Sequence, residues 1–554
     1  MTRNPSTGER DGGLAVLGAD PGWAAPALLL VVALAHAGAL RAGFVWDDTP
    51  LLLRNTLLGD PAALGALLSG DLWAGAPVED GRSGYYRPLL MLDYSVDVAL
   101  FGLSAAWMHL RGLLWHLLAV AAAWRLARGL FAPWPAAVAA LIFGLHPVQV
   151  EAVTWIAARN DPMAAALGGW ALVAAARPTR GAAVGAGLLS GLALLTKESA
   201  LLLPALHLAW VWARGGTTRA ALPGARALVL GLLPPLSLRL ALGVDGAGLP
   251  SAAGWALFGE AAPGLAGLSA GLLLAPLPGA AGWALEYLDR APAWRFGMGV
   301  LAIVLGVVAL LRARPGLRGG ALLWLAAAGA PPLLAVADKG LFGERYLYLG
   351  LIGVGWLVGA QLSARTARPA AALLALLGAV GLHARAPDWA DDGALWAASR
   401  AAVPTPYTAA SAGHAHFLAG DLEGARAAFI VAIDDPEPWL DACAPLLATA
   451  VDQGRVPLGV QLAAWAALQG CDSPRFRSSQ ALLLAASGRW AEAERAVARA
   501  GGDPTGRAEV VRAALALRAG DEAAVRALEA GFVGAPPLRA QAAQLLMAAG
   551  GGEP

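Results

Sequence analysis

Two adjacent carboxylates, Asp47 and Asp48, end the motif GFVWDD just after the first long apolar run of the chain. A carboxylate beside a hydroxyl can take the proton of that hydroxyl as its oxygen attacks an electrophilic carbon. The pair is therefore a candidate general base. A solvated loop pair or a helix cap would account for the same two residues, so the motif alone leaves these interpretations open.

Further ionisable groups gather in the motifs YYRPLLMLDYSVD, HLRGLLWH, HPVQVEAVTWIAARND and GERYLYLG, and around the lysines. The candidate cations are Arg87, Arg159, Lys197 and Arg345, and the other polar candidates are His109, His116, His146, Glu151, Asp161, Glu198, Glu344 and Tyr346. A cavity that gathered these groups would hold carboxylates for acid–base work and cations for a phosphate. His109 and His116 share one helix face without a third ligand at a metal-like spacing. No motif requires a metal or a cofactor, so we predict neither, while a divalent ion bound at Asp47 and Asp48 is left open.

The elements that position these residues are mostly apolar. Of the 554 residues, 58% are hydrophobic and 14% are charged, with a mean hydropathy of +0.58, whereas soluble proteins are about 25% charged. Residues 1–384 carry 46 charged side chains and residues 385–554 carry 33. We therefore predict a polytopic membrane domain followed by a soluble one. The net charge of +1, without a basic block, argues against a nucleic-acid partner.

A membrane span needs about 20 mostly apolar residues. Eleven runs fit, several of them short and rich in Gly and Ala, which favours close helix packing. They are 23–43, 105–126, 132–148, 161–177, 181–196, 198–213, 226–243, 297–312, 319–337, 343–362 and 368–384. The predicted fold class is all-α: a bundle of about eleven membrane helices, then a helical repeat domain at 385–554.

Arginine sets the predicted orientation. With a cytoplasmic N-terminal tail at 1–22, the inside loops hold Arg125 and Arg128, Arg177 and Arg180, Arg214, Arg219 and Arg226, Arg312, Arg314 and Arg318, and Arg365 and Arg368. This agrees with the positive-inside rule and makes 44–104 and 244–295 outside loops. The apolar piece near 262–282 is then re-entrant, interfacial or one of two further spans, and its prolines favour the first two. We expect an uncleaved first span rather than a signal peptide.

The tail repeats itself. A Gly followed by a polar residue recurs at Gly420, Gly454, Gly488 and Gly520, at spacings of 34, 34 and 32 residues. A period of 34 residues with helix–turn–helix patterning is typical of tetratricopeptide repeats, and an Ala-rich bundle with accidental spacing is the alternative. Cys443 and Cys471 both lie in this domain, where they could form a disulfide or remain two buried thiols.

The motifs FVWDD, YRPLLMLDYSVDVALFGL, LHPVQVEAVTWIAARND, LLTKESALLLP and ERYLYLG follow one another between about residues 40 and 400, with a histidine-containing second span. In this order they resemble the transmembrane-and-tetratricopeptide-repeat (TMTC) O-mannosyltransferases of the GT-C glycosyltransferase superfamily. The resemblance implies a GT-C-type helix bundle that moves a sugar, a mannose-like hexose, from a polyprenyl-phosphate carrier to a hydroxyl acceptor. The transfer would be an inverting single displacement.

Carried over to this sequence, the resemblance puts Asp47 and Asp48 in the catalytic position without choosing the base. It makes Arg87, Arg159, Lys197 and Arg345 phosphate-facing cations, and places His146, Glu151 and Glu198 in the same motifs without clear roles. The sequence departs from the family at Arg111, where Asn is usual, at Val148–Glu151, where His-Thr-Glu is common, and in its short repeat array. These departures concern the sugar and the acceptor more than the chemistry.

Two other functions fit parts of the sequence. A membrane-anchored repeat scaffold for protein partners is the main alternative, although eleven spans exceed what an anchor needs. A transporter should show paired halves and broken helices near the midplane, and no such repeat is visible.

The 38 arginines against two lysines, with abundant Ala and Gly, favour a GC-rich bacterial genome. We therefore expect a bacterial inner membrane, undecaprenyl phosphate as the carrier, and a periplasmic active face and repeat domain, with the acceptor or a partner protein held by the repeats.

Overall fold

Helices make up nearly all of the computed structural model, which describes residues 22–76, 83–244, 250–501, 505–531 and 538–549. The all-α fold class is confirmed. The chain divides into two compact units, Met1–Ala398 and Ser399–Pro554. Most of the predicted N-terminal tail, 1–22, lies outside the described residues.

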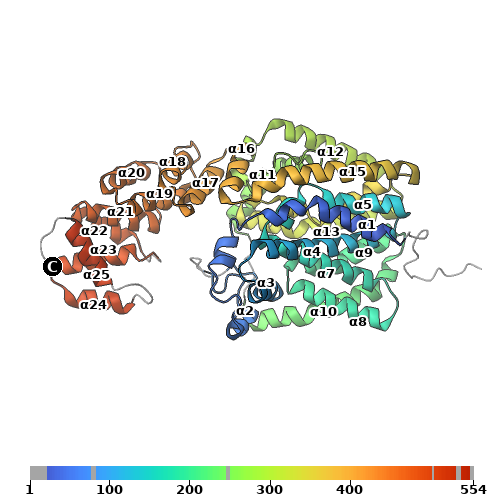
Figure 1. The fold of residues 1–554 in the computed structure, drawn as a ribbon, viewed down its shortest axis with the longest axis horizontal. Coiled ribbons are helices and arrows are strands. Elements are labelled where there is room, and N and C mark those ends of the chain that lie inside the picture. Colours follow the sequence, from blue (N-terminus) through green and yellow to red (C-terminus); the bar gives the residue numbers. More distant parts are fainter. Residues whose placement is uncertain (1–21, 77–82, 245–249, 502–504, 532–537, 550–554) are drawn as a thin grey trace, which may run out of the picture. The chain divides into compact units, whose positions relative to one another are not determined.

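Each of the eleven predicted spans contains a helix of the first unit (Figure 1). These are α1 (Ala24–Ala35), α4 (Ala105–Arg128), α5 (Pro133–Leu145), α7 (Asn160–Ala175), α8 (Arg180–Leu194), α9 (Leu203–Ala213), α10 (Thr218–Ala241), α12 (Ala293–Arg312), α13 (Pro315–Lys339), α14 (Gly350–Gly359) and α15 (Ala364–Arg385). Among the described helices, α4, α10, α12, α13 and the stretch Ala364–Trp389 that contains α15 are long and apolar enough to cross a membrane. This is a multi-pass membrane protein.

Short 3-10 turns connect the helices and strands of the first unit and carry several polar residues of the site. The turns used below are η1 (Ala37–Arg41), η4 (Ile156–Arg159), η5 (Glu198–Leu202), η7 (Glu344–Leu347) and η8 (Ala386–Trp389). A single π turn, η2 (Thr49–Leu53), and the helices α2 (Leu64–Ser69), α3 (Pro88–Phe101) and α6 (Gln149–Thr154) complete this end. Proline stands at the first position of α3, α5 and α13, where a backbone N–H would have no partner within the helix, so its missing N–H costs no helical hydrogen bond.

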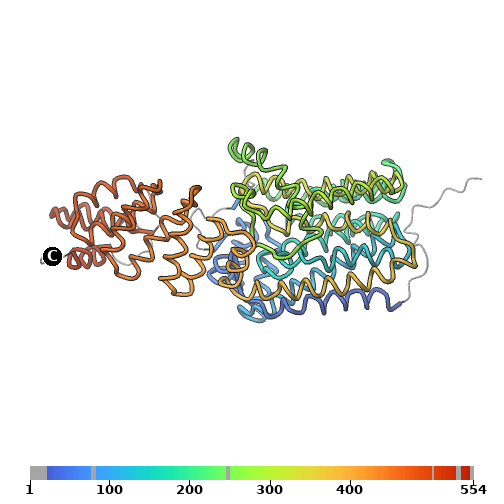
Figure 2. The backbone as a smooth tube through the Cα atoms, turned by 90° about the horizontal axis from the view of Figure 1, so that it is seen from above, coloured from blue at the N-terminus to red at the C-terminus, as the bar shows by residue number. Residues whose placement is uncertain are grey.

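The helices of the bundle run side by side, as Figure 2 shows. Helix α8 packs between α7 and α10, α9 packs on α13, and α5 packs on α14 and α15. Helix α11 (Ala252–Leu272) continues through Pro263, ends before Pro276, and packs on α12. Two short strands, β1 (Trp283–Ala284) and β2 (Leu341–Phe342), pair antiparallel with Trp283 opposite Phe342, and so tie the segment after α11 to the segment after α13.

The second unit is a series of helical hairpins. Its helices are α17 (Pro406–Leu418), α18 (Leu422–Ile433), α19 (Cys443–Asp452), α20 (Val456–Leu468), α21 (Pro474–Ala486), α22 (Trp490–Arg499), α23 (Arg507–Arg518), α24 (Glu522–Gly531) and α25 (Leu538–Ala548), and α16 (Asp392–Ala402) crosses the division between the units. The recurring glycines, Gly420, Gly454, Gly488 and Gly520, all have φ between +65° and +79°. Glycine recurs because each turn needs a left-handed residue.

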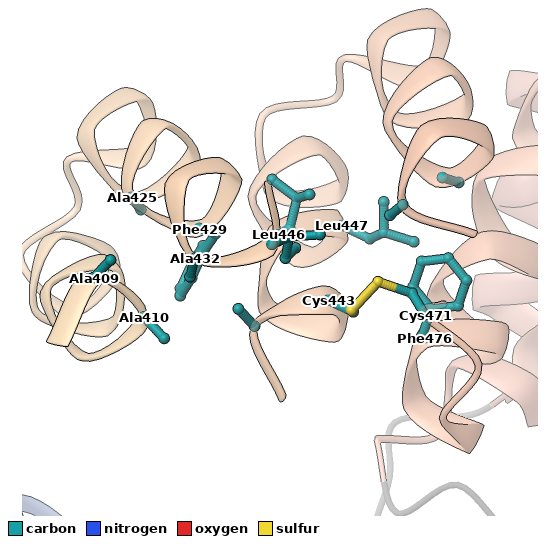
Figure 3. Packing of buried hydrophobic residues seen from close by; sticks show 14 of the residues in the cluster. Ala409, Ala410, Ala425, Phe429, Ala432, Cys443, Leu446, Leu447, Cys471 and Phe476 are labelled. Carbon is teal, nitrogen blue, oxygen red and sulfur yellow. A yellow bond between two sulfur atoms is a disulfide. The ribbon is translucent and has the colours of Figure 1, made fainter. Parts of the chain in front are cut away.

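Cys443 and Cys471 form a disulfide, which answers the question the sequence left open. The bond joins the start of α19 to the loop before α21, and both cysteines are buried in a core with Phe429, Leu446 and Phe476 (Figure 3). Burial among apolar side chains protects the bond from solvent thiols. Intracellular proteins of most organisms rarely keep such a bond, so it favours an oxidising compartment for this unit.

Candidate active site

A cavity of about 360 Å³ lies at the polar end of the first unit. Its wall brings together residues far apart in sequence, from the loop after η1 to η7. Its ionisable lining residues are Asp47, Arg87, Asp161, Lys197, Glu198, Arg239, Asp338 and Arg345, together with Tyr85, Tyr346 and Tyr348. Of the candidates predicted from sequence, Asp47, Arg87, Asp161, Lys197, Glu198, Arg345 and Tyr346 therefore share one cavity.

Asp47 presents a carboxylate to this cavity from the turn before η2. No hydrogen bond to that carboxylate occurs among the described residues, so its oxygens remain available to a ligand. Burial raises the pKa of Asp47 to about 6, an effect that Arg345 opposes and Asp392 reinforces. A carboxylate with a pKa just below neutral is mostly ionised at pH 7 and is more basic than an exposed one, as a general base should be.

Asp48 has a different environment from its neighbour. Its carboxylate accepts the backbone N–H of Val45 at 3.1 Å and that of Ala157 at 2.7 Å, and its side chain is fully buried. It does not line the cavity. Burial raises the pKa of Asp48 to about 8, although both backbone donors oppose the rise. Asp48 therefore fastens the GFVWDD turn to η4, whereas Asp47 faces the space where chemistry could occur.

The turn itself is strained. Trp46, between Val45 and Asp47, has φ of +54° and is the one non-glycine residue with positive φ in the described parts of the chain. A left-handed backbone costs an L-residue on the order of 1–2 kcal/mol, and the cost is seldom accepted by a bulky side chain. The indole of Trp46 stacks on that of Trp155, with ring centroids 4.6 Å apart and planes 8° apart. This stacking helps to hold the conformation.

The cations of the cavity are each fixed by a carboxylate. Glu198 lies between two guanidinium groups, that of Arg87 at 2.9 Å and that of Arg239 at 3.4 Å. Lys197 pairs with Asp161 at 2.5 Å, and Arg345 pairs with the fully buried Glu151. Because a fixed cation needs little reorganisation when negative charge develops beside it, such pairs suit transition-state stabilisation.

Arg239 was not among the sequence candidates. It lies near the end of α10, within the predicted span 226–243, and also donates to the backbone oxygen of Gly84 at 2.8 Å. An arginine in the last turn of an otherwise apolar helix is the signal that could have identified it, since charged groups inside spans are costly and usually functional.

Arg159 lies outside the cavity lining. It is fully buried and donates to Asp93 and Asp97, both at 2.6 Å, and to the backbone oxygen of Met108 at 2.7 Å. Arg111 pairs with the same two carboxylates. This network joins α3, α4 and η4, and its charges neutralise one another. The network therefore stabilises the packing of these elements beside the site, and Arg159 does not contact a ligand in the cavity.

The candidate histidines do not line the cavity, and each of them contacts a backbone carbonyl instead. His109 approaches the carbonyl of Ala42 at 3.0 Å, and His146 approaches that of Leu273 at 3.0 Å. His116 lies 2.6 Å from the hydroxyl of Tyr348 and 3.1 Å from the carbonyl of Gly144. Within the described residues, no group of three or more His, Cys, Asp or Glu side chains could hold a metal ion.

Glu344 is buried behind the cavity. It pairs with Arg385 and accepts the backbone N–H of Ala280 at 3.1 Å. Since Glu344 begins η7 and Arg385 ends α15, the pair fixes the turn that carries Arg345 and Tyr346 into the cavity. Glu344 therefore supports the site without lining it.

The remaining wall is apolar and aromatic. Helix α13 contributes Ala328, Pro331, Pro332, Leu334 and Ala335, and the aromatic residues Trp73 and Trp155 lie elsewhere on the lining. Leu334 is 47% exposed, so this helix also presents apolar surface outward from the unit. The cavity thus combines a charged side with an apolar side that reaches the surface of the bundle. Such a space suits an amphipathic ligand whose polar head meets the charged groups.

Residues 92–237 match the sequence family described as dolichyl-phosphate-mannose-protein mannosyltransferase. The chain is 33% identical over 128 residues to the protein O-mannosyl-transferase Tmtc2 of Drosophila melanogaster. The aligned segment covers 23% of this chain and 14% of that protein. The chain is 31% identical over 135 residues to TMTC3 of Mus musculus, covering 24% and 15%, and 30% identical over 132 residues to TMTC3 of Homo sapiens, covering 24% and 14%. The matched part thus spans about one seventh of these relatives' length. No solved structure matches the chain significantly.

Proposed function

We propose that this chain, which resembles the TMTC O-mannosyltransferases in its ordered motifs and in residues 92–237, is a membrane glycosyltransferase of the GT-C type. It would take a hexose, mannose-like, from a polyprenyl-phosphate donor and transfer it to a hydroxyl acceptor. The observation that carries the proposal is a single cavity that joins one unpartnered carboxylate, four fixed cations and an apolar helix face.

In the proposed reaction Asp47 is the general base. It takes the proton of the acceptor hydroxyl while the oxygen attacks the anomeric carbon, and the bond from that carbon to the phosphate oxygen breaks. The sugar centre becomes oxocarbenium-like and the departing lipid phosphate gains negative charge. One displacement inverts the anomeric configuration and needs no covalent nucleophile on the enzyme. Asp48 keeps the turn in place and has no direct role.

The phosphate would lie beside Arg87 and Arg239. These two guanidinium groups share one carboxylate, Glu198, so together the three residues carry a net charge of +1. Lys197 and Arg345 are each matched by a carboxylate of their own, Asp161 and Glu151. A monoanionic phosphodiester is therefore attracted most strongly to the arginine pair. The lipid chain would follow the apolar face of α13.

Localisation and partners follow from the same proposal. By the positive-inside rule the arginine-rich loops favour a cytoplasmic position for the opposite end of the bundle, so the cavity would open on the periplasmic side of a bacterial inner membrane. The buried disulfide of the second unit agrees with an oxidising compartment. The helical hairpins, proposed to be tetratricopeptide-like repeats, would hold a protein or glycan acceptor or a partner protein.

The test is transfer in proteoliposomes. Purified full-length protein is supplied with radiolabelled polyprenyl-phosphate mannose, glucose or galactose and a mixture of serine- and threonine-containing peptides, and the loss of lipid-linked label is followed. Turnover of one donor that disappears in Asp47→Asn supports the proposal and identifies the sugar. A folded protein that turns over none of these donors would favour the anchored scaffold instead.

A further inference from the structure

The strained residue beside the base is held from a distant part of the chain. The backbone N–H of Trp46 donates to Oδ1 of Asp392 at 2.6 Å, across 346 residues of sequence. The indole of Trp396 meets that of Trp46 edge to face, with ring centroids 5.3 Å apart. Asp392 begins α16 and Trp396 lies one turn further along the same helix. The start of α16 therefore holds Trp46 by both its backbone and its ring.

A second contact reinforces this one. The backbone N–H of Gly43 donates to the carbonyl of Ala390 at 2.9 Å. A Cβ at Gly43 would lie 2.5 Å from that carbonyl oxygen, so only glycine permits the approach. The GFVWDD turn is thus attached at two points, to Ala390 by Gly43 and to Asp392 by Trp46. On its other side the stacked ring of Trp155 completes the enclosure of the Trp46 indole.

We infer that Asp392 is a positioning residue for Asp47: its hydrogen bond, with the ring of Trp396, keeps Trp46 in the left-handed conformation that directs the Asp47 carboxylate into the cavity. A polypeptide without this restraint would leave the strained region, since a bulky residue gains free energy by returning to negative φ. The next residue would then change direction. The inference rests on the proposed function, because it assigns Asp392 a part in presenting that reaction's base.

Asp392 also acts on Asp47 through its charge. Its negative charge reinforces the raised pKa of Asp47, while Arg345 opposes it. Asp48 is next to Asp47 in the chain, and Asp161 and Lys197, which pair with each other, line the same cavity. Removing the charge of Asp392 should therefore make Asp47 a weaker base that stays ionised to lower pH. Geometry and charge can be separated, because asparagine keeps the acceptor oxygen and loses the charge.

The experiment compares Asp392→Asn and Asp392→Ala in the proteoliposome transfer assay over pH 5 to 8. With Asp392→Ala we expect kcat to fall about tenfold or more while KM for the donor stays within about twofold. With Asp392→Asn we expect most of the kcat at high pH to be kept. In both variants the acidic limb of the rate profile should move to lower pH by roughly 0.5 to 1 unit.

Asp391→Ala is the matched control. Asp391 is exposed and accepts the backbone N–H of Ala394 at 2.8 Å, so its substitution removes a hydrogen bond and a charge at the start of the same helix but none of the contacts that α16 makes with Trp46. If the wild-type protein transfers sugar and Asp392→Ala has the same kinetics as Asp391→Ala, the inference is overturned and the proposed function stands. A wild-type protein that transfers no sugar would remove both.

Discussion

Exchanging each carboxylate of the GFVWDD motif for its amide tests the division of roles between the two. Asp47→Asn removes the base and leaves the fold nearly untouched, because no hydrogen bond to that carboxylate occurs among the described residues. A positioned general base contributes about 10²- to 10⁴-fold to a rate, which is roughly 3 to 5 kcal/mol of barrier. We expect kcat to fall by that factor, with the melting temperature unchanged.

Asp48→Asn should affect stability more than chemistry. Each oxygen of Asp48 accepts one backbone N–H, from Val45 and from Ala157, whereas an asparagine has a single acceptor oxygen. One buried donor would therefore face an amide NH₂, at a cost of about 1–3 kcal/mol. We expect a lower melting temperature and a fall in kcat of less than about tenfold in the protein that remains folded.

The assay is single-turnover transfer from labelled polyprenyl-phosphate sugar, with melting followed in the same detergent. Asp60→Asn is the control, because Asp60 is an exposed residue of the same loop region, where it caps η3 (Pro61–Ala63). The reasoning would be refuted if Asp47→Asn transferred sugar normally while Asp48→Asn, at an unchanged melting temperature, did not. That result would make Asp48 the base and the observed turn a resting arrangement.

Four further outcomes are expected. The rate of transfer should rise with pH through about 6, because burial raises the pKa of Asp47 to about 6 and only its ionised form accepts a proton; a flat profile from pH 5 to 8 would contradict this. Arg239→Gln should raise the donor KM or lower kcat about as much as Arg87→Gln, in steady-state kinetics with the donor varied, whereas equality with wild type would remove Arg239 from the phosphate site. Arg159→Leu should lose about 3–5 kcal/mol of stability by leaving the buried Asp93 and Asp97 without their main cation, measured by thermal melting. Cys443→Ser with Cys471→Ser should cost the second unit about 3–4 kcal/mol, as expected for a loop of 28 residues, measured by thermal melting.

Helical periodicity and hydropathy are local properties, and they were sufficient for most of the fold. Every predicted span contains a helix, because a run of apolar residues in a bilayer has no other way to satisfy its backbone hydrogen bonds. The recurring glycines of the tail coincide with left-handed turns for an equally local reason. The lengths were less predictable, since α1 is shortened by the 3-10 turn η1 that follows it and α14 by the 3-10 turn η7 that precedes it, and the geometry of such turns depends on the polar residues packed around them.

The candidate site was predictable in composition but not in its pairings. The sequence grouped Arg159 with Arg87 because both stand in polar motifs, yet Arg159 meets Asp93 and Asp97 on α3 and is neutralised there. Arg239 was missed because an arginine near the end of an apolar span is also the usual pattern of an interfacial anchor, so the signal was read as structural. Nor could the sequence separate Asp47 from Asp48, since the direction of two adjacent side chains depends on the backbone of Trp46.

The conformation of Trp46 depends in turn on contacts that no window of sequence contains. Asp392 lies beyond the last predicted span, in the region assigned from composition to the soluble domain, and yet α16 begins within the first unit. Trp46, and through it the proposed base, is therefore held by Asp392 and Trp396 only when the first and last parts of the bundle have folded together. A chain truncated after α15 would keep every predicted span and every cation of the cavity. It would lose Asp392 and Trp396, so the same physical argument requires such a truncation to impair transfer even if the donor still binds.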